Sequence, residues 1–193
     1  MSKRFAAKAI LFDLDGTLLD TITDLTEAAN LMQAELGRPA LSQERVHSFV
    51  GRGVNDFIHR CLAEGGEPSD AEVRSAHGIF SRHYLCVNGR TTQPYPGVSE
   101  LLATLAERRL KMGVVTNKST LFTLPLLQQF NLTQYFGTIV CGDTLTVKKP
   151  DPTMIVHACG LLGAKQALVG SSQQFYYQIG FRPHATSTFW EAR

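Results

Sequence analysis

One stretch near the start of the chain constrains the fold most, because it places two acids directly after a short apolar run. The run Ala9 to Phe12 predicts a buried β-strand, and Asp13 and Asp15 follow it before Gly16, which lets the chain turn. A carboxylate can bind a cation, attack as a nucleophile or exchange protons, depending on its neighbours and on any metal ion present. The pattern therefore predicts a polar site where a strand ends, and it leaves the chemistry open.

A calcium-binding loop is a second interpretation of Asp-x-Asp-Gly. Such a loop needs a third oxygen-bearing residue before the glycine and a glutamate further on, and it lies between helices. Here a strand precedes the acids and Thr17 follows the glycine. The stretch does not fit that interpretation.

The second half of the chain alternates between two periodicities. Helices are expected at 98–109, 121–130 and 151–162, and strands at 111–115, 138–141 and 167–169. Strands that alternate with helices favour an α/β core with a Rossmann-like, doubly wound parallel sheet. The strand before Asp13 belongs to that sheet.

The intervening segment predicts helices and no strand. Its clearest signal is Ser69 to Glu72, which fits a capping box and opens a helix that reaches about Val87. We therefore expect an α-helical cap at 21–91, inserted into a core made of 1–20 and 92–193. An insertion directly after the strand with the acids lies over the carboxyl ends of the sheet, where open α/β folds bind ligands, and it can exclude water.

Charge and composition narrow the class of partner. The net charge is +2 and there is no long basic run, so we expect a small-molecule ligand and no nucleic acid. No stretch approaches the roughly 18 apolar residues of a membrane span. The four cysteines are too far apart in sequence to suggest a zinc site or a disulfide framework, so we expect buried thiols in a cytoplasmic protein. The oligomeric state stays open.

The string from Ile10 to Thr21 resembles the first motif of the haloacid dehalogenase-like phosphatases, and the order of elements resembles their subgroup with a small helical cap. The resemblance implies that Asp13 is phosphorylated and that Asp15 is the acid and base. It also implies that both residues hold Mg²⁺, Asp15 through its backbone carbonyl, and that Gly16 and Thr17 lie beside the phosphate.

Two further strand ends carry polar residues. Thr116 and Asn117 precede a helix, whose N-terminus can bind a phosphate oxygen, although a plain helix cap is the alternative. Lys149 precedes Pro150, and taken alone the pair Lys148-Lys149 fits a solvated surface. Beside the first motif these strings resemble the family's second and third motifs, in which Lys149 neutralises the nucleophile and the transferring phosphoryl group.

The local sequences of 141–152, 35–39 and 50–53 resemble those of phosphoglycolate phosphatases in particular. This resemblance implies 2-phosphoglycolate as the substrate and a cap loop that faces the active site. Arg52 in that loop is then a candidate for binding the substrate carboxylate, with a merely solvated arginine as the alternative.

The resemblance stops within the fourth motif, Gly-Asp-x-x-x-Asp. Gly170 is present, but Ser171 and Phe175 stand where the two acids are expected, and 171–193 resembles nothing in the family. Weaker Mg²⁺ binding should follow, and losing ~3–4 kcal/mol of metal assistance lowers the rate by roughly two to three orders of magnitude. The strand at 167–169 would also become a sheet edge, which 185–190 could cover.

Two alternatives to a phosphatase stay open. One is a phosphotransferase similar to β-phosphoglucomutase. The other is a catalytically silent protein that binds phosphate or another protein. The second acid, Asp15, argues against a dehalogenase, whose reaction has no leaving alkoxide to protonate.

Overall fold

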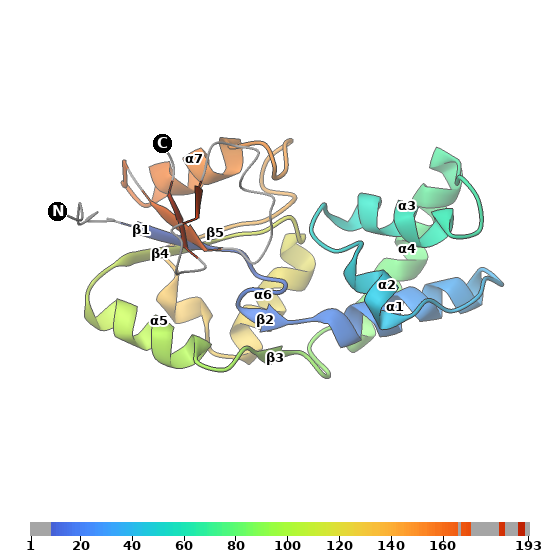
Figure 1. Cartoon of the computed structure of the whole chain (residues 1–193), viewed down its shortest axis with the longest axis horizontal. Helices are drawn as coiled ribbons and strands as arrows, with labels where there is room; N and C mark the ends of the chain where they lie inside the picture. The colour runs from blue at the N-terminus through green and yellow to red at the C-terminus, as the bar shows by residue number, and fades with distance from the viewer. Residues whose placement is uncertain (1–8, 166, 171–181, 184–188, 192–193) are drawn as a thin grey trace.

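The computed structural model describes residues 9–165, 167–170, 182–183 and 189–191. Its main sheet has the order β5-β4-β1-β6-β8-β7 (Figure 1). The parallel strands are β1 (Ala9–Phe12), β4 (Lys111–Val115), β5 (Thr138–Val140) and β6 (Leu168–Gly170). The expected α/β fold with a parallel sheet is confirmed.

The edge beside β6 is covered by an antiparallel strand. Strand β8 (Phe189–Glu191) pairs with β6, and β7 (Arg182–Pro183) pairs with β8. The expected cover by 185–190 thus holds for the end of that segment, while 184–188 lie outside the described residues. Pairing satisfies backbone groups that an open edge would expose.

Helices cover both faces of the sheet, as Figure 1 shows. Helices α5 (Val98–Glu107) and α6 (Thr120–Gln129) lie on one face with the short 3₁₀ helix η1 (Thr133–Tyr135), and α7 (Thr153–Leu161) lies on the other. The side chains of β1 point alternately to the two faces of the sheet. Ile10 and Phe12 pack in one apolar cluster, and Ala9 and Leu11 pack in the other. All four are buried, so β1 lies in the centre of the core.

The beginning of α7 differs from the expectation. The sequence predicts a helix from residue 151, but the helix begins at Thr153, with Pro152 at the N-cap. The Asp151 carboxylate still accepts a hydrogen bond from the Thr153 N–H, at 2.8 Å. The acid therefore satisfies a free N–H of the first turn from one position further out.

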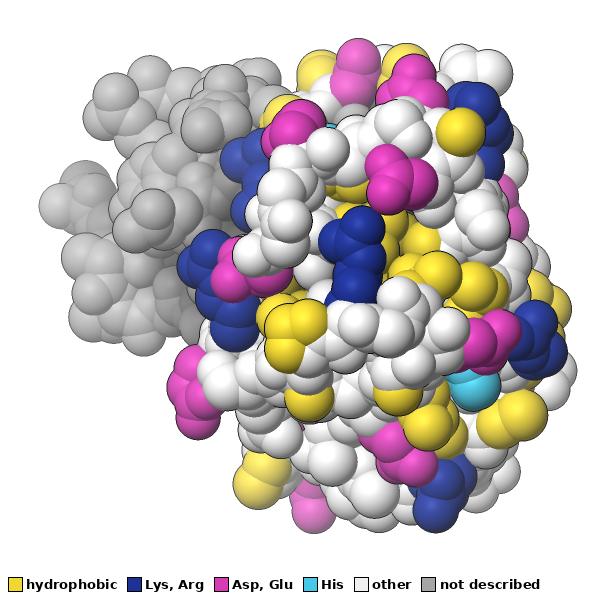
Figure 2. Space-filling model, turned by 90° about the vertical axis from the view of Figure 1, so that its right-hand side faces the viewer, with side chains coloured by type: hydrophobic (Ala, Val, Ile, Leu, Met, Phe, Trp, Pro, Cys, Tyr) yellow, Lys and Arg dark blue, Asp and Glu magenta, His cyan; other side chains and the backbone are white. Residues whose placement is uncertain are grey.

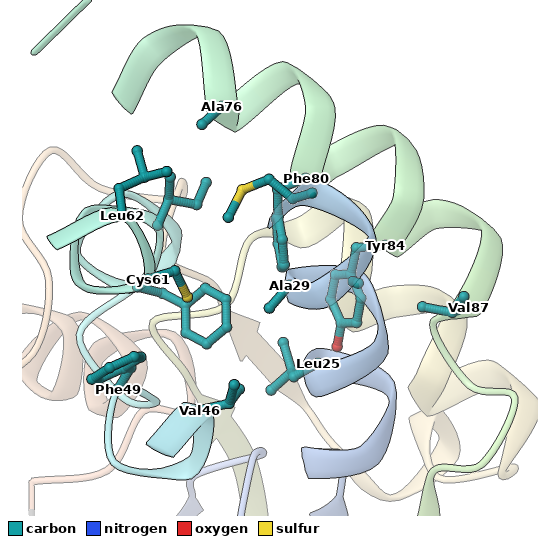
Figure 3. Close-up of a cluster of buried hydrophobic side chains, with 14 of the residues drawn as sticks. Leu25, Ala29, Val46, Phe49, Cys61, Leu62, Ala76, Phe80, Tyr84 and Val87 are labelled. Atoms are coloured by element: carbon teal, nitrogen blue, oxygen red, sulfur yellow. The ribbon is translucent and has the colours of Figure 1, made fainter. Parts of the chain in front are cut away.

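Between β1 and β4 the chain forms four cap helices, α1 (Ile22–Glu35), α2 (Gln43–His47), α3 (Val54–Ala63) and α4 (Asp70–Val87). The capping box of Ser69 and Glu72 is confirmed. The helices share an apolar cluster of their own, into which Phe80 and Tyr84 project from α4 (Figure 3). Phe122 of α6 also packs in this cluster, so the cap rests on the core through apolar contacts.

The two crossings between core and cap lie side by side. Strand β2 (Leu19–Asp20) pairs antiparallel with β3 (Gln93–Pro94), which the sequence pattern did not indicate. Asp24 of α1 ties the same two segments together, because its buried carboxylate accepts five hydrogen bonds from Gly89, Thr91 and Thr92. The cap is thus attached to the core by one paired and bonded joint.

The surface at the cap end carries charges of both signs. Figure 2 views the end formed by the cap, where acidic and basic side chains are interspersed and no patch of one sign stands out. In the part of the chain that the structure describes, no helix is long and apolar enough to cross a membrane. The cysteine expectation is partly wrong, because Cys61 and Cys141 are buried but Cys86 is exposed.

Candidate active site

Asp13 lies at the carboxyl end of β1, in the middle of the sheet. Its N–H donates to the carbonyl of Gly170 at 3.0 Å, which extends the pairing of β1 with β6 by one residue. The carboxylate is 14 % exposed. Oδ1 accepts from the N–H of Leu14 at 2.8 Å, and Oδ2 forms an ion pair with Lys149 Nζ at 2.8 Å. The acid is therefore fixed at both oxygens.

Lys149 is buried. The alternative interpretation, in which the pair Lys148-Lys149 forms a solvated surface, is therefore wrong for Lys149. Its ammonium bonds to the carbonyl of Val115 at the end of β4, 2.9 Å away, as well as to Asp13. A buried ammonium needs such partners, because an unpaired charge is costly to desolvate. The structure thus brings the residues of the first and third motifs into contact.

The second motif lies between them. Thr116 is buried directly after β4, and its hydroxyl oxygen accepts from the N–H of Lys118 at 3.1 Å, which leaves the O–H proton for another acceptor. The Asn117 side chain bonds to the backbone of Lys149 and to the carbonyl of Gly51. A phosphate contact by Asn117 would therefore fall to its backbone N–H.

Asp15 has a cationic partner that sequence reasoning missed. Its Oδ1 accepts from the Thr21 hydroxyl at 2.7 Å and forms an ion pair with Lys118 Nζ at 3.0 Å. Lys118 also donates to the hydroxyl of Tyr84 on α4, at 2.6 Å. Lys118 directly follows Thr116 and Asn117 in the second motif, so its position in the sequence could have indicated a place in the site. Tyr84 lies on an apolar helix face, and its sequence position gave no such indication.

Burial shapes the protonation of this group. Burial alone would lower the pKa of the Lys118 ammonium, but the Asp15 carboxylate and the Tyr84 hydroxyl raise it above its ordinary value. Burial raises the pKa of Tyr84 to about 12. At neutral pH the pair is therefore a charged ammonium and a neutral phenol.

Both acids line a small cavity of about 60 Å³ between the sheet and the cap. On the core side the lining is polar apart from Phe122 of α6, and its polar residues beside the two acids are Thr116, Asn117, Lys118 and Ser119. On the cap side it is apolar apart from Tyr84 and the loop glycines, and consists of Leu25, Val50, Val54, Phe57 and Phe80. The cavity therefore has one end suited to a charged group and one suited to a small apolar group.

The remaining predicted residues lie in two turns. Gly16 has a φ of +73°, and its N–H donates to the carbonyl of Leu19, while the N–H of Thr17 donates to the carbonyl of Leu14. Arg52 is exposed, although its neighbours Gly51 and Gly53 line the cavity. Phosphate binding by Gly16 and Thr17 and carboxylate binding by Arg52 stay predictions.

The described residues fit Mg²⁺ poorly. They contain no group of three or more His, Cys, Asp or Glu side chains able to hold a metal ion. The oxygens expected there are the Asp13 carboxylate, already bonded to Lys149 and Leu14, and the Asp15 carbonyl. Mg²⁺ prefers an octahedron of oxygens, including one or two carboxylates. Ser171 and Phe175, at the positions of the missing acids, lie outside the described residues.

Comparisons with known proteins show the family to which the chain is similar. A family model described as haloacid dehalogenase-like hydrolase matches residues 10–170. The phosphoglycolate phosphatase of Nitrosospira multiformis is 44% identical over 154 residues, which cover 79% of this chain and 68% of that protein. The plasmid-encoded phosphoglycolate phosphatase of Cupriavidus necator is 42% identical over 167 residues, covering 85% and 72%. The solved structure of a predicted phosphoglycolate phosphatase from Haemophilus somnus has a TM-score of 0.76 at 28% identity, covering 83% and 74%.

Proposed function

Because this chain belongs to the haloacid dehalogenase-like hydrolase family, we propose that it hydrolyses a small phosphomonoester, 2-phosphoglycolate, through an aspartyl-phosphate intermediate. One observation carries the proposal: Asp13 and Asp15 line one cavity together with Thr116, and Lys149 is paired with Asp13. This set contains a nucleophile, a proton donor and donors for the phosphoryl oxygens.

The first step transfers the phosphoryl group to the protein. A carboxylate oxygen of Asp13 attacks phosphorus, and the ester P–O bond breaks as Asp15 gives a proton to the leaving alkoxide. Thr116 and Lys149 stabilise the charge on the phosphoryl oxygens, since both are buried beside Asp13 and act in a site of low dielectric.

The second step returns the protein to its starting state. Asp15, now a carboxylate, takes a proton from water, and the water oxygen attacks phosphorus. The bond between phosphorus and Asp13 breaks, inorganic phosphate leaves, and Asp15 holds the proton for the next cycle. Every proton in this scheme moves through Asp15, so its orientation matters in both steps.

The cavity favours a small substrate. Its cap side is apolar apart from the Tyr84 hydroxyl and the backbone of Gly51 and Gly53, so it has few partners for the hydroxyl groups of a sugar. A sugar phosphate, as in the phosphoglucomutase-like alternative, would leave polar groups unpaired there. 2-Phosphoglycolate brings no hydroxyl group to that side and has only one carbon between its ester oxygen and its carboxylate, for which Arg52 beside Gly51 and Gly53 stays the predicted partner. The relatives named for its hydrolysis match most of this chain.

Activity is expected to be impaired. The chain has Ser171 and Phe175 where the family motif has acids, and the described donors fit Mg²⁺ poorly. When bound, the metal supplies Lewis-acid assistance worth several kcal/mol. The same loss supports a second candidate function, a silent protein that binds a phosphate ester without turning it over.

The test is release of phosphate from 2-phosphoglycolate with and without Mg²⁺. Asp13→Asn is the blank, and Asp20→Asn, at an exposed aspartate nearby, is the matched control that should retain the wild-type rate. Release that disappears only in Asp13→Asn supports the proposal, and a phosphorylated peptide containing Asp13, trapped by acid quench, would identify the intermediate. Equal release by Asp13→Asn would contradict it. No release from folded wild-type protein would favour the silent binding protein.

A further inference from the structure

The ammonium of Lys118 joins the cap to the acid–base residue of the core. Lys118 follows β4, and its side chain is 5 % exposed. One N–H bonds to Asp15 Oδ1 at 3.0 Å, and another donates to the hydroxyl of Tyr84 on cap helix α4 at 2.6 Å. A continuous chain of bonds therefore runs from the cap through Lys118 to Asp15.

The two bonds to Asp15 orient its carboxylate. Thr21 and Lys118 both bond to Oδ1, one from the joint between core and cap and one from the second motif. Among the described residues, Oδ2 receives no hydrogen bond, and Asp15 lines the cavity. This geometry holds the carboxylate by one oxygen and leaves the other to exchange a proton with a substrate.

Tyr84 is itself held rigidly. Its ring is buried, 4.7 Å from the ring of Phe122 and 5.3 Å from that of Phe80 between centroids, and Figure 3 shows it packed beside Leu25. The Lys118 ammonium lies 4.7 Å from the centroid of the same ring, within cation–π range. The hydroxyl therefore has a fixed position from which to bind the ammonium.

We propose that Lys118 is a positioning residue that fixes Asp15 for proton transfer, and that Tyr84 of the cap holds Lys118 in place. The proposal rests on the proposed function, since it concerns the protonation of a leaving alkoxide by Asp15. It explains why a charged side chain is buried at the boundary between cap and core. It also makes the seated cap part of the catalytic arrangement, beyond excluding water.

Three substrates separate this role from its alternatives. 2-Phosphoglycolate and isobutyl phosphate have poor leaving groups that need a proton, and they differ in the carboxylate. p-Nitrophenyl phosphate releases a stable phenolate and needs little protonation. We would compare kcat/KM, which covers the steps up to loss of the alcohol and excludes the later attack by water.

Lys118→Met should lower kcat/KM for both alkyl phosphates by about 100-fold, the scale of acid catalysis, and for p-nitrophenyl phosphate by less than about tenfold. Lys118→Arg should recover part of the loss, because it restores the charge. Tyr84→Phe removes one hydroxyl and keeps the ring packing, so it should give the same pattern with a smaller loss. If Lys118→Met does not fold, the same comparison of kcat/KM across the three substrates is made with Tyr84→Phe and Lys118→Arg.

Two kinetic outcomes would overturn the proposal. An equal loss for all three substrates would show a merely structural role. A loss confined to 2-phosphoglycolate would show that Lys118 binds the substrate carboxylate instead.

Crystal structures of the wild type and of Lys118→Met, or of Tyr84→Phe in its place, test the proposal without activity. The Asp15 carboxylate should move by more than about 0.5 Å, the tolerance of a productive site. An unmoved Asp15 would refute the proposal. If wild-type protein releases phosphate from none of the substrates, the proposed function fails, and these structures still decide the role of Lys118.

Discussion

The side-chain amide of Asn117 and the backbone of Lys149 bond to each other in both directions. Asn117 Nδ2 donates to the Lys149 carbonyl and Asn117 Oδ1 accepts from the Lys149 N–H, each at 2.9 Å, and Nδ2 also donates to the carbonyl of Gly51 at 2.8 Å. One side chain thus fixes the backbone of the lysine beside Asp13 and one end of the cap loop.

Replacing Asn117 by alanine should lower kcat by a larger factor than the equilibrium constant for unfolding changes. The Lys149 backbone would lose its partners, and a displacement of about 1 Å at a reacting group can cost 100-fold in rate. Phosphate-release kinetics and thermal unfolding measure the two effects. Asn55→Ala, at an exposed position in α3, is the matched control and should change neither. Unchanged kcat in Asn117→Ala would show that Lys149 keeps its place without the amide.

Gly142→Ala should be strongly destabilising, because a Cβ built on Gly142 would meet the carbonyl oxygen of Asn117 in direct overlap. Backbone cannot yield as a side-chain tip can, so we expect a cost of about 1–3 kcal/mol or more. Gly160→Ala in α7 has open space around its Cβ and should instead stabilise by roughly 0.5–1 kcal/mol. Urea unfolding of both variants checks the contrast, and a stable Gly142→Ala would contradict the close approach.

Asp24 should make stability depend on acid pH. Burial raises the pKa of Asp24, but hydrogen bonds from Thr91 and Thr92 outweigh it and hold the pKa below the ordinary 3.8. A lowered pKa in the folded state gives stability above the unfolded-state pKa that is lost as the pH falls through the folded-state value. The free energy of unfolding should therefore decrease below about pH 4.

Asp24→Asn removes that contribution and should cost roughly 2–3 kcal/mol at pH 7, because hydrogen bonds to a charged acceptor are lost. Its unfolding free energy should then fall less steeply than the wild type between pH 5 and pH 3, measured by urea titration at each pH. Glu107→Gln, at an exposed acid, is the control and should follow the wild-type curve. Parallel curves for Asp24→Asn and the wild type would refute the assignment.

Restoring the fourth motif should restore metal-dependent turnover. The double variant Ser171→Asp, Phe175→Asp supplies the two carboxylates that the family motif has, and we expect Mg²⁺-dependent release of phosphate to rise by roughly two to three orders of magnitude. Ser172→Asp, Gln174→Asp adds the same charge at neighbouring positions and should give no such rise. Equal effects of the two double variants would attribute the change to charge alone.

The parts of this molecule that local sequence patterns specify were predictable. Strand β1 is a continuous apolar run that ends at an acid, and the Ser69 capping box marks the beginning of α4, so each is encoded within a few residues. The contact of Lys149 with Asp13 joins residues far apart in sequence, and only resemblance to a family indicated it.

The rest depends on how the cap lies against the core. Tyr84 shares a helix face with Phe80 and Val87, so its spacing predicts a residue of the apolar core. The spacing gives no indication of its hydrogen bond to Lys118. Asp24 likewise lies on the buried face of α1, and its partners come from a segment without periodicity. Strands β2 and β3 have two residues each, too few for any alternation to show.

The paired joint of β2 and β3 makes the cap an exchangeable module. Asp20 lies opposite Gln93 and Leu19 opposite Pro94, so the chain leaves the core and returns to it at a single place. A chimaera could therefore carry a foreign cap between these positions without altering the sheet that holds Asp13. Such a graft would inherit the recipient's Lys118 but not its Tyr84, so its designer would have to supply a hydroxyl at the same point of the donor helix.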